Sequence, residues 1–132
     1  MKRFAVVVLF FSIVAVPSFA KTHKDDYSVS CAVLWAAVKD TLRNSGKYGI
    51  IGIDNTELTA SFNIGGTLTG KRTNSVLLNA KGDAACEMQV QTAYSGLVNN
   101  DAGDFKKRVD ESLAKQRAAP PAPAAKPESP NK

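Results

Sequence analysis

The chain has 132 residues, which is enough for one small domain with short appendages and excludes a TIM barrel or any multidomain enzyme. Its 17 Lys and Arg residues exceed its 12 Asp and Glu residues, which gives a formal net charge of +5. These basic residues form no dense stripe interleaved with aromatics, so the composition argues against a protein that binds nucleic acid.

The first segment, 1–20, has the three-part layout of a secretory signal peptide. Lys2 and Arg3 precede an apolar run over 4–16, and the small residues that follow favour cleavage after Ala20. The alternative is a retained signal anchor. The run is shorter than the roughly 18–20 residues that span a bilayer, which argues against that alternative. We therefore expect an exported protein, periplasmic or extracellular, with no stable membrane span after cleavage.

Residues 21–26 are polar, and we expect them to be frayed. Beyond them, apolar side chains recur every three or four positions from Tyr27 to Leu42, which is the spacing of one stripe along a helix. The pattern predicts a helix over 28–45, and Gly46 suits the left-handed position that follows a helix.

The middle of the chain has the texture of β-strands. Residues 48–53 are rich in Ile, and residues 57–64 and 84–93 alternate between apolar and polar side chains. Residues 74–80 also predict a strand, whereas 67–73 could extend a hairpin arm or form a loop. The alternation is typical of antiparallel strands that cover a core on one face.

Residues 95–103 are rich in Gly and Asn and predict a loop. Beyond it, an apolar residue at every fourth position predicts a second helix over 102–117. Residues 118–132 are rich in Pro and Ala and offer no apolar surface that would repay ordering, so we expect a disordered tail. The folded part is therefore expected to be a single domain over 21–117.

The order helix, strands, helix predicts an α+β fold. Each predicted strand has one apolar face, and each predicted helix has one apolar stripe. The simplest packing is a two-layer sandwich, with the N-terminal and C-terminal helices on one face of a three- or four-stranded antiparallel meander.

Cys31 and Cys86 are the two cysteines, and an exported protein can keep them oxidised. Cys31 lies on the apolar stripe of the first predicted helix, and Cys86 lies on the apolar face of the last predicted strand, so both point into the same layer. We expect a disulfide, which would contribute roughly 4 kcal/mol by the chain-entropy model. The alternative is a pair of reduced, buried thiols.

The opposite face of the predicted sheet is polar and almost uncharged. It is a possible surface for a glycan or a partner protein, although an antiparallel sheet commonly has one face that is simply wet. The candidate binding residues are Thr59, Ser61, Asn63, Glu87, Gln89 and Gln91.

No catalytic constellation is recognisable. The single histidine, His23, lies in the stretch expected to be frayed, where no imidazole would be held in place. Residues 65–71 mimic the opening of a P-loop, but Arg72 stands where Ser or Thr would hold magnesium, so a Gly-rich hairpin tip is favoured. Residues 99–104 lack the spacing of a calcium loop. We predict no catalytic residue, no metal site and no cofactor, and a protein that is not an enzyme.

An Ile-rich strand over Gly49–Asp54 precedes an alternating strand over Leu58–Phe62, and Asp104 and Phe105 open the last predicted helix. This layout resembles a set of small exported bacterial envelope proteins of uncharacterised function. The resemblance implies an envelope location and the order helix, antiparallel strands, helix, and it supplies no catalytic residues. Many members carry a lipid anchor on a cysteine at the cleavage site, where this chain has Ala20.

The leading hypothesis is a small exported envelope protein that acts as a non-enzymatic binding or accessory module, with an unknown envelope protein or a glycan as its partner. The alternative is a small secreted hydrolase or hydrolase inhibitor that acts through the loops at 65–74 and 95–104, because loops on rigid scaffolds often carry function. A third hypothesis is a cell-wall associate held by the tail at 118–132.

Overall fold

A computed structural model describes residues 21–66, 70–93 and 100–119, so the predicted signal peptide and nearly all of the predicted tail lie outside the described residues. The elements in chain order are β1 (Lys21–Tyr27), α1 (Cys31–Asn44), β2 (Gly49–Asp54), β3 (Thr59–Ile64), β4 (Arg72–Ala80), β5 (Cys86–Thr92) and α2 (Asp101–Ala118).

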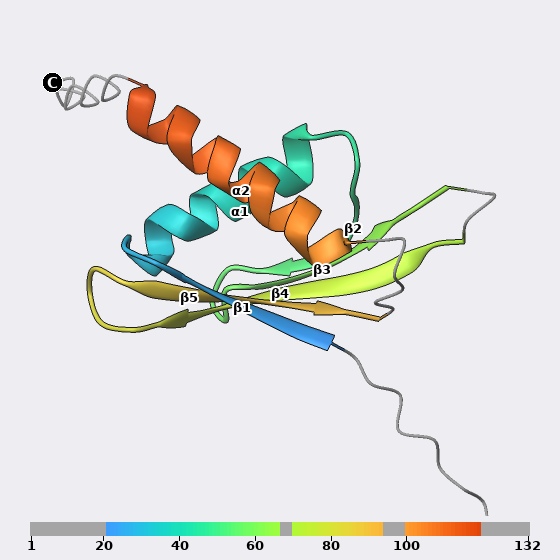
Figure 1. Cartoon of the computed structure of the whole chain (residues 1–132), viewed down its shortest axis with the longest axis horizontal. Helices are drawn as coiled ribbons and strands as arrows, with labels where there is room; N and C mark the ends of the chain where they lie inside the picture. Colours follow the sequence, from blue (N-terminus) through green and yellow to red (C-terminus); the bar gives the residue numbers. More distant parts are fainter. Residues whose placement is uncertain (1–20, 67–69, 94–99, 120–132) are drawn as a thin grey trace, which may run out of the picture.

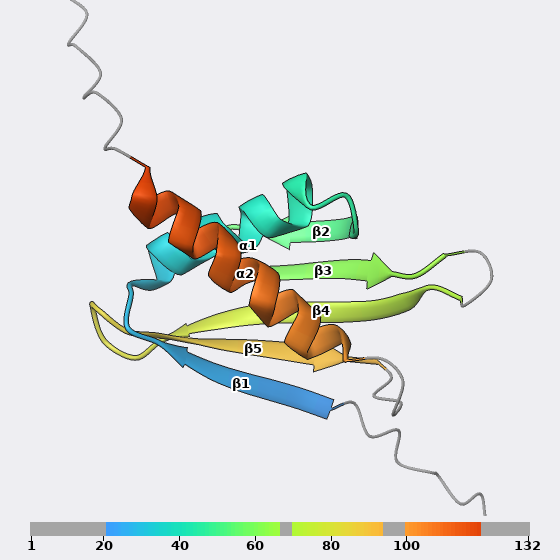
Figure 2. The same ribbon diagram turned by 45° about the horizontal axis from the view of Figure 1, so that its top comes forward.

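The strands form one antiparallel sheet in the order β1-β5-β4-β3-β2, and both helices pack on the same face of it (Figures 1 and 2). The prediction of a two-layer α+β sandwich is therefore confirmed. Strands β2 to β5 form the predicted meander in its four-stranded form, and β1 adds a fifth strand beside β5. Of the stretch at 67–73, Arg72 and Thr73 belong to β4, while 67–69 lie outside the described residues.

The expectation that residues 21–26 are frayed is wrong. They pair with β5 in an unbroken antiparallel register, from Lys21 opposite Thr92 to Tyr27 opposite Cys86. Their side chains are polar or charged and give no apolar alternation, so the strand is held by main-chain pairing to a neighbour distant in the sequence. Sequence patterns that depend on burial miss such an edge strand.

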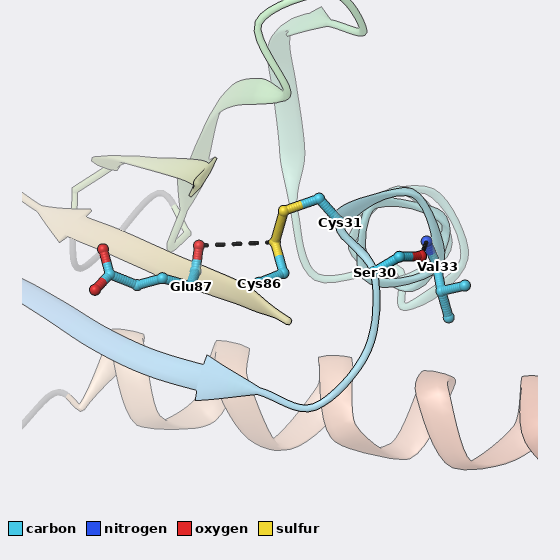
Figure 3. Close-up of a disulfide and its surroundings, with 5 residues drawn as sticks. All are labelled: Ser30, Cys31, Val33, Cys86 and Glu87. Atoms are coloured by element: carbon cyan, nitrogen blue, oxygen red, sulfur yellow. Dashed lines mark hydrogen bonds between the residues drawn. A yellow bond between two sulfur atoms is a disulfide. The ribbon is translucent and has the colours of Figure 1, made fainter. Parts of the chain in front are cut away.

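Helix α1 begins at Cys31, three residues later than the predicted start at 28, because Tyr27 is committed to β1. The side chain of Ser30 caps the helix by accepting a hydrogen bond from the backbone N–H of Val33 (Figure 3). Gly46 follows the helix with φ +69°, which agrees with its predicted left-handed role.

The core fills the layer between the helices and the sheet. The rings of Phe62 and Phe105 stack with centroids 4.9 Å apart, and Tyr48 meets each of them edge-on at 5.2 and 5.5 Å. The side chain of Trp35 is also buried, and its Nε1 donates a hydrogen bond to Asn55 in the β2–β3 turn. Further side chains with almost no exposure complete this layer: Leu34, Val38, Val76, Met88, Val90 and Val109.

The predicted disulfide between Cys31 and Cys86 is confirmed, with a Cα–Cα distance of 5.0 Å (Figure 3). It joins the first residue of α1 to the first residue of β5. Because Cys86 also lies opposite Tyr27 in the sheet, the bridge closes the corner where β1 turns into the helix layer. It therefore fixes α1 over the sheet.

Candidate functional site

The structure places all six predicted binding residues on the sheet face that points away from the helices. Side chains on neighbouring antiparallel strands share a face when they lie opposite each other. Ser61 lies opposite Ser75, which in turn lies opposite Gln91, and these three make a row across the middle of the sheet. The residues of this outer face alternate with the buried core residues along each strand.

Two adjoining hollows lie on the outer face. Both include Ser61, Ser75 and Gln91, and their volumes are about 400 and 420 Å³. Both hollows are open to solvent and not enclosed. The first hollow is completed by Thr73, Asn74 and Ala93, and the second by Thr22, Thr59, Ala60, Val76, Leu77 and Gln89.

Neither hollow is lined by a charged residue. The absence of charge from both linings is notable because 22% of the residues in the chain are charged. Charged side chains border the row that contains Gln89 and Thr59. Lys24 of β1 lies opposite Gln89, and Asp54 of β2 lies opposite Thr59. The hollows are therefore a neutral patch that combines hydroxyl and amide groups with apolar side chains, and in this row Lys24 and Asp54 flank it.

Two of the predicted residues, Asn63 and Glu87, do not line either hollow. The Glu87 carboxylate accepts a hydrogen bond from the Gln89 amide and lies 3.2 Å from the Nζ of Lys81. The hydrogen bond from Gln89, followed by the contact with Lys81, lowers the pKa of Glu87, which therefore stays ionised at neutral pH. Its charge is held at the periphery of the site.

Eight residues that line the hollows were not predicted from the sequence, and four of them show why. Ser75 and Leu77 could have been found, because they occupy the outward positions of the predicted strand at 74–80. Thr73 precedes that predicted strand, and Thr22 belongs to β1, which was not predicted as a strand. The periodicity therefore predicted residues at the centre of the two hollows and not the full extent of their lining.

The two segments of the alternative hypothesis meet at one end of the sheet. The guanidinium of Arg72 donates two hydrogen bonds to the carboxylate of Asp101, at 2.7 and 2.9 Å, and both side chains are largely buried. The pair joins the start of β4 to the start of α2 and engages the Asp101 carboxylate. Residues 67–69 and 94–99 of these segments lie outside the described residues.

His23 lies in β1 opposite Val90, and no described residue hydrogen-bonds to its ring. Where the structure shifts the pKa of a carboxyl group, at Asp40, Asp54 and Glu87, the shift is downward. Over the described ranges there is no group of three His, Cys, Asp or Glu residues that could hold a metal ion. Among the same residues, no helix has the length and apolar character needed to cross a membrane.

No protein-family model matches the chain, and no curated protein sequence matches it. Solved structures share its fold. Norcoclaurine synthase from Thalictrum flavum, in complex with dopamine and hydroxybenzaldehyde, aligns over 89% of this chain and 96% of its own, with 11% identity and a TM-score of 0.51. The truncated form of that enzyme aligns over 75% and 92%, with 12% identity and a TM-score of 0.50. The shared architecture is the helix-grip fold, in which an antiparallel sheet packs against a C-terminal helix.

Proposed function

We propose that this protein is an exported, non-enzymatic binding module that holds a neutral glycan on the outer face of its sheet. The observation that carries the proposal is the pair of adjoining hollows around Ser61, Ser75 and Gln91, which are lined without a charged residue. The helix-facing side of the sheet is filled by core side chains, so the outer face is the side that offers room to a ligand.

The chemistry of the lining favours a hydroxyl-rich ligand. Serine and threonine hydroxyls and the glutamine amide each donate and accept hydrogen bonds, as sugar hydroxyls do. An anionic or cationic ligand would leave its charge without a partner in these hollows. The energetic centres of protein interfaces are enriched in Trp, Tyr and Arg, and neither hollow contains one of these residues. A glycan is therefore favoured over a protein partner.

The dimensions of the site fit a short oligosaccharide. The lining residues extend from Thr22 in β1 to Thr59 and Ser61 in β3, which are three strand spacings apart. Three spacings correspond to about 14 Å. We infer that the site accommodates two or three sugar rings, of which the central one would lie over Ser75.

The leader, the disulfide and the position of the first strand support export. The leader has the layout of a signal peptide, and the disulfide between Cys31 and Cys86 suits an oxidising compartment. All of the described strands lie after the expected cleavage position, so removal of the leader would leave each of them in the chain. The periplasm and the extracellular space both fit these features.

The proposal is tested by measuring the affinity of the oxidised chain from Lys21 onward for a panel of neutral oligosaccharides that includes tri-N-acetylglucosamine, cellotriose and maltotriose. Ser75→Arg places a long charged side chain in both hollows, and we expect it to weaken binding by at least about tenfold. Thr56→Arg adds the same charge in the exposed β2–β3 turn and is expected to leave the affinity unchanged. Absence of binding to every sugar, or equal effects of the two variants, would contradict the proposal.

A further inference from the structure

The two edges of the sheet differ in how they are protected. An edge strand presents unpaired backbone N–H and C=O groups, which charged side chains commonly shield. Strand β1 carries four such charges, whereas Gly49 to Ile53 of β2 carries none. In β2 the side chains of Ile50 and Ile51 are 43% and 58% exposed. The charged residues of β1 are Lys21, Lys24, Asp25 and Asp26.

Opposite charges flank β2. Lys47 precedes the strand and Asp54 ends it, both side chains are exposed, and neither forms an ion pair with another described residue. The Asp54 carboxylate accepts the backbone N–H groups of Thr56 and Glu57 through one oxygen, and its other oxygen makes no hydrogen bond to a described residue. Antiparallel pairing of two copies of β2 would bring a cation beside an anion at both ends.

A β-bulge at the centre of β2 sets the register in which two copies can pair. Gly49 and Gly52 lie opposite outer-face residues of β3, whereas Ile50 lies opposite Phe62 on the helix-facing side, so Ile51 is the extra residue. Because of the bulge, Gly49 and Gly52 share a face although they are three positions apart. In a two-fold arrangement, Ile50 of one copy can lie opposite Ile51 of the other. Gly49 then lies opposite Gly52 of the other copy, on the same face of the joined sheet, and Lys47 lies beside Asp54 of the other copy.

We propose that β2 is a self-association edge, which pairs antiparallel with β2 of a second copy of this chain across a two-fold axis at Ile50 and Ile51. Pairing removes the exposed isoleucine side chains from water at the two-fold axis, and the flanking glycines allow the two backbones to approach closely. The two ion pairs between Lys47 and Asp54 select the antiparallel direction. A bulge disfavours pairing of an edge with a regular strand, and in this register the bulges of the two copies meet at the two-fold axis. The same surface is used by both copies, as in other two-fold dimers.

The first test is sedimentation of the oxidised chain from Lys21 onward at micromolar to millimolar concentrations. We expect a concentration-dependent dimer, and we expect Ile51→Lys to raise its dissociation constant by at least about tenfold. Val33→Lys is the matched control, because Val33 is 43% exposed on α1 and is not part of the proposed edge. A chain that stays monomeric, or a dimer that Ile51→Lys leaves intact, would overturn the proposal.

A charge exchange tests the register. Lys47→Glu alone and Asp54→Lys alone each set like charges together at both ends, so each variant is expected to be monomeric at concentrations where the unchanged chain is dimeric. An equimolar mixture of the two restores both ion pairs and is expected to form the heterodimer. Asp54→Asn keeps an acceptor for the turn N–H groups and controls for damage to the turn, and it should weaken the dimer less than Asp54→Lys does. Failure of the mixture to associate would overturn the proposed register.

Discussion

Asn74 is the residue at which the core departs most from the usual pattern. It lies in β4 between Phe62 and Thr92 on the helix-facing side, is 2% exposed, and has no hydrogen-bond partner for either amide atom among the described residues. A buried polar group without a partner costs about 1–3 kcal/mol. A β-branched apolar residue would suit this strand position better.

We therefore expect Asn74→Val to increase the free energy of unfolding by about 1–2 kcal/mol in urea denaturation. The control is Thr73→Val at the neighbouring exposed position, for which a change of less than about 0.5 kcal/mol is expected. A loss of stability in Asn74→Val would mean that the amide has a hydrogen-bond partner in solution, which would contradict the destabilising role assigned to Asn74.

Single residues of the outer face were partly visible in the sequence. Ser61 and Gln91 were found because clean alternation assigns them to the polar side of their strands. Thr22 was not found, because nothing in a polar run with Lys, His and Asp indicates a strand. The ion pair of Arg72 with Asp101 was also invisible, since two residues 29 positions apart meet there only through the sheet and helix that carry them.

At the scale of elements, the two helices are joined by a polar contact whose strength depends on pH. Ser112 of α2 donates a 2.6 Å hydrogen bond to the Asp40 carboxylate of α1, and Asn44 donates a second one. These bonds, the one from Ser112 first, lower the pKa of Asp40 below its ordinary value of 3.8. A depressed folded-state pKa stabilises the fold above the unfolded-state value, and the stabilisation is lost as pH falls through the folded-state value.

We expect the free energy of unfolding to fall as the pH is lowered from about 5 to 2, and Asp40→Asn to make that dependence shallower because the variant has no carboxylate to protonate. Urea denaturation of both proteins at several pH values measures the difference. Identical slopes for the two proteins would contradict the assigned role of Asp40.

Most elements could be predicted because their burial patterns are periodic. The apolar stripe that includes Leu34, Val38 and Leu42 identified α1, and the alternation around Phe62 and Met88 identified β3 and β5. The start of α1 was set too early, because Tyr27 faces the helix layer from β1 and continues the stripe without being part of the helix. Its hydroxyl bonds to Asp110 of α2, a contact between segments that are distant in the sequence.

At the scale of the whole molecule, the two faces of the sheet differ in what covers them. The helix layer and the disulfide close one face of the sheet, and the opposite face carries two hollows that are lined without a charged residue. Pairing through β2 would join the sheets of two copies with both outer faces on the same side. Two glycan sites on one joined surface would bind a repeating polymer with higher avidity than one site does.

The central claim is that the outer face is the binding surface, and a footprint by NMR tests it most directly. Backbone amide signals of the oxidised chain from Lys21 onward are followed while tri-N-acetylglucosamine, cellotriose or maltotriose is added. We predict that for at least one of these sugars the shifted signals cluster at Ser61, Ser75 and Gln91 and leave α1 and α2 unchanged. Shifts confined to the helices, or no shift with any of the three sugars, would contradict the account.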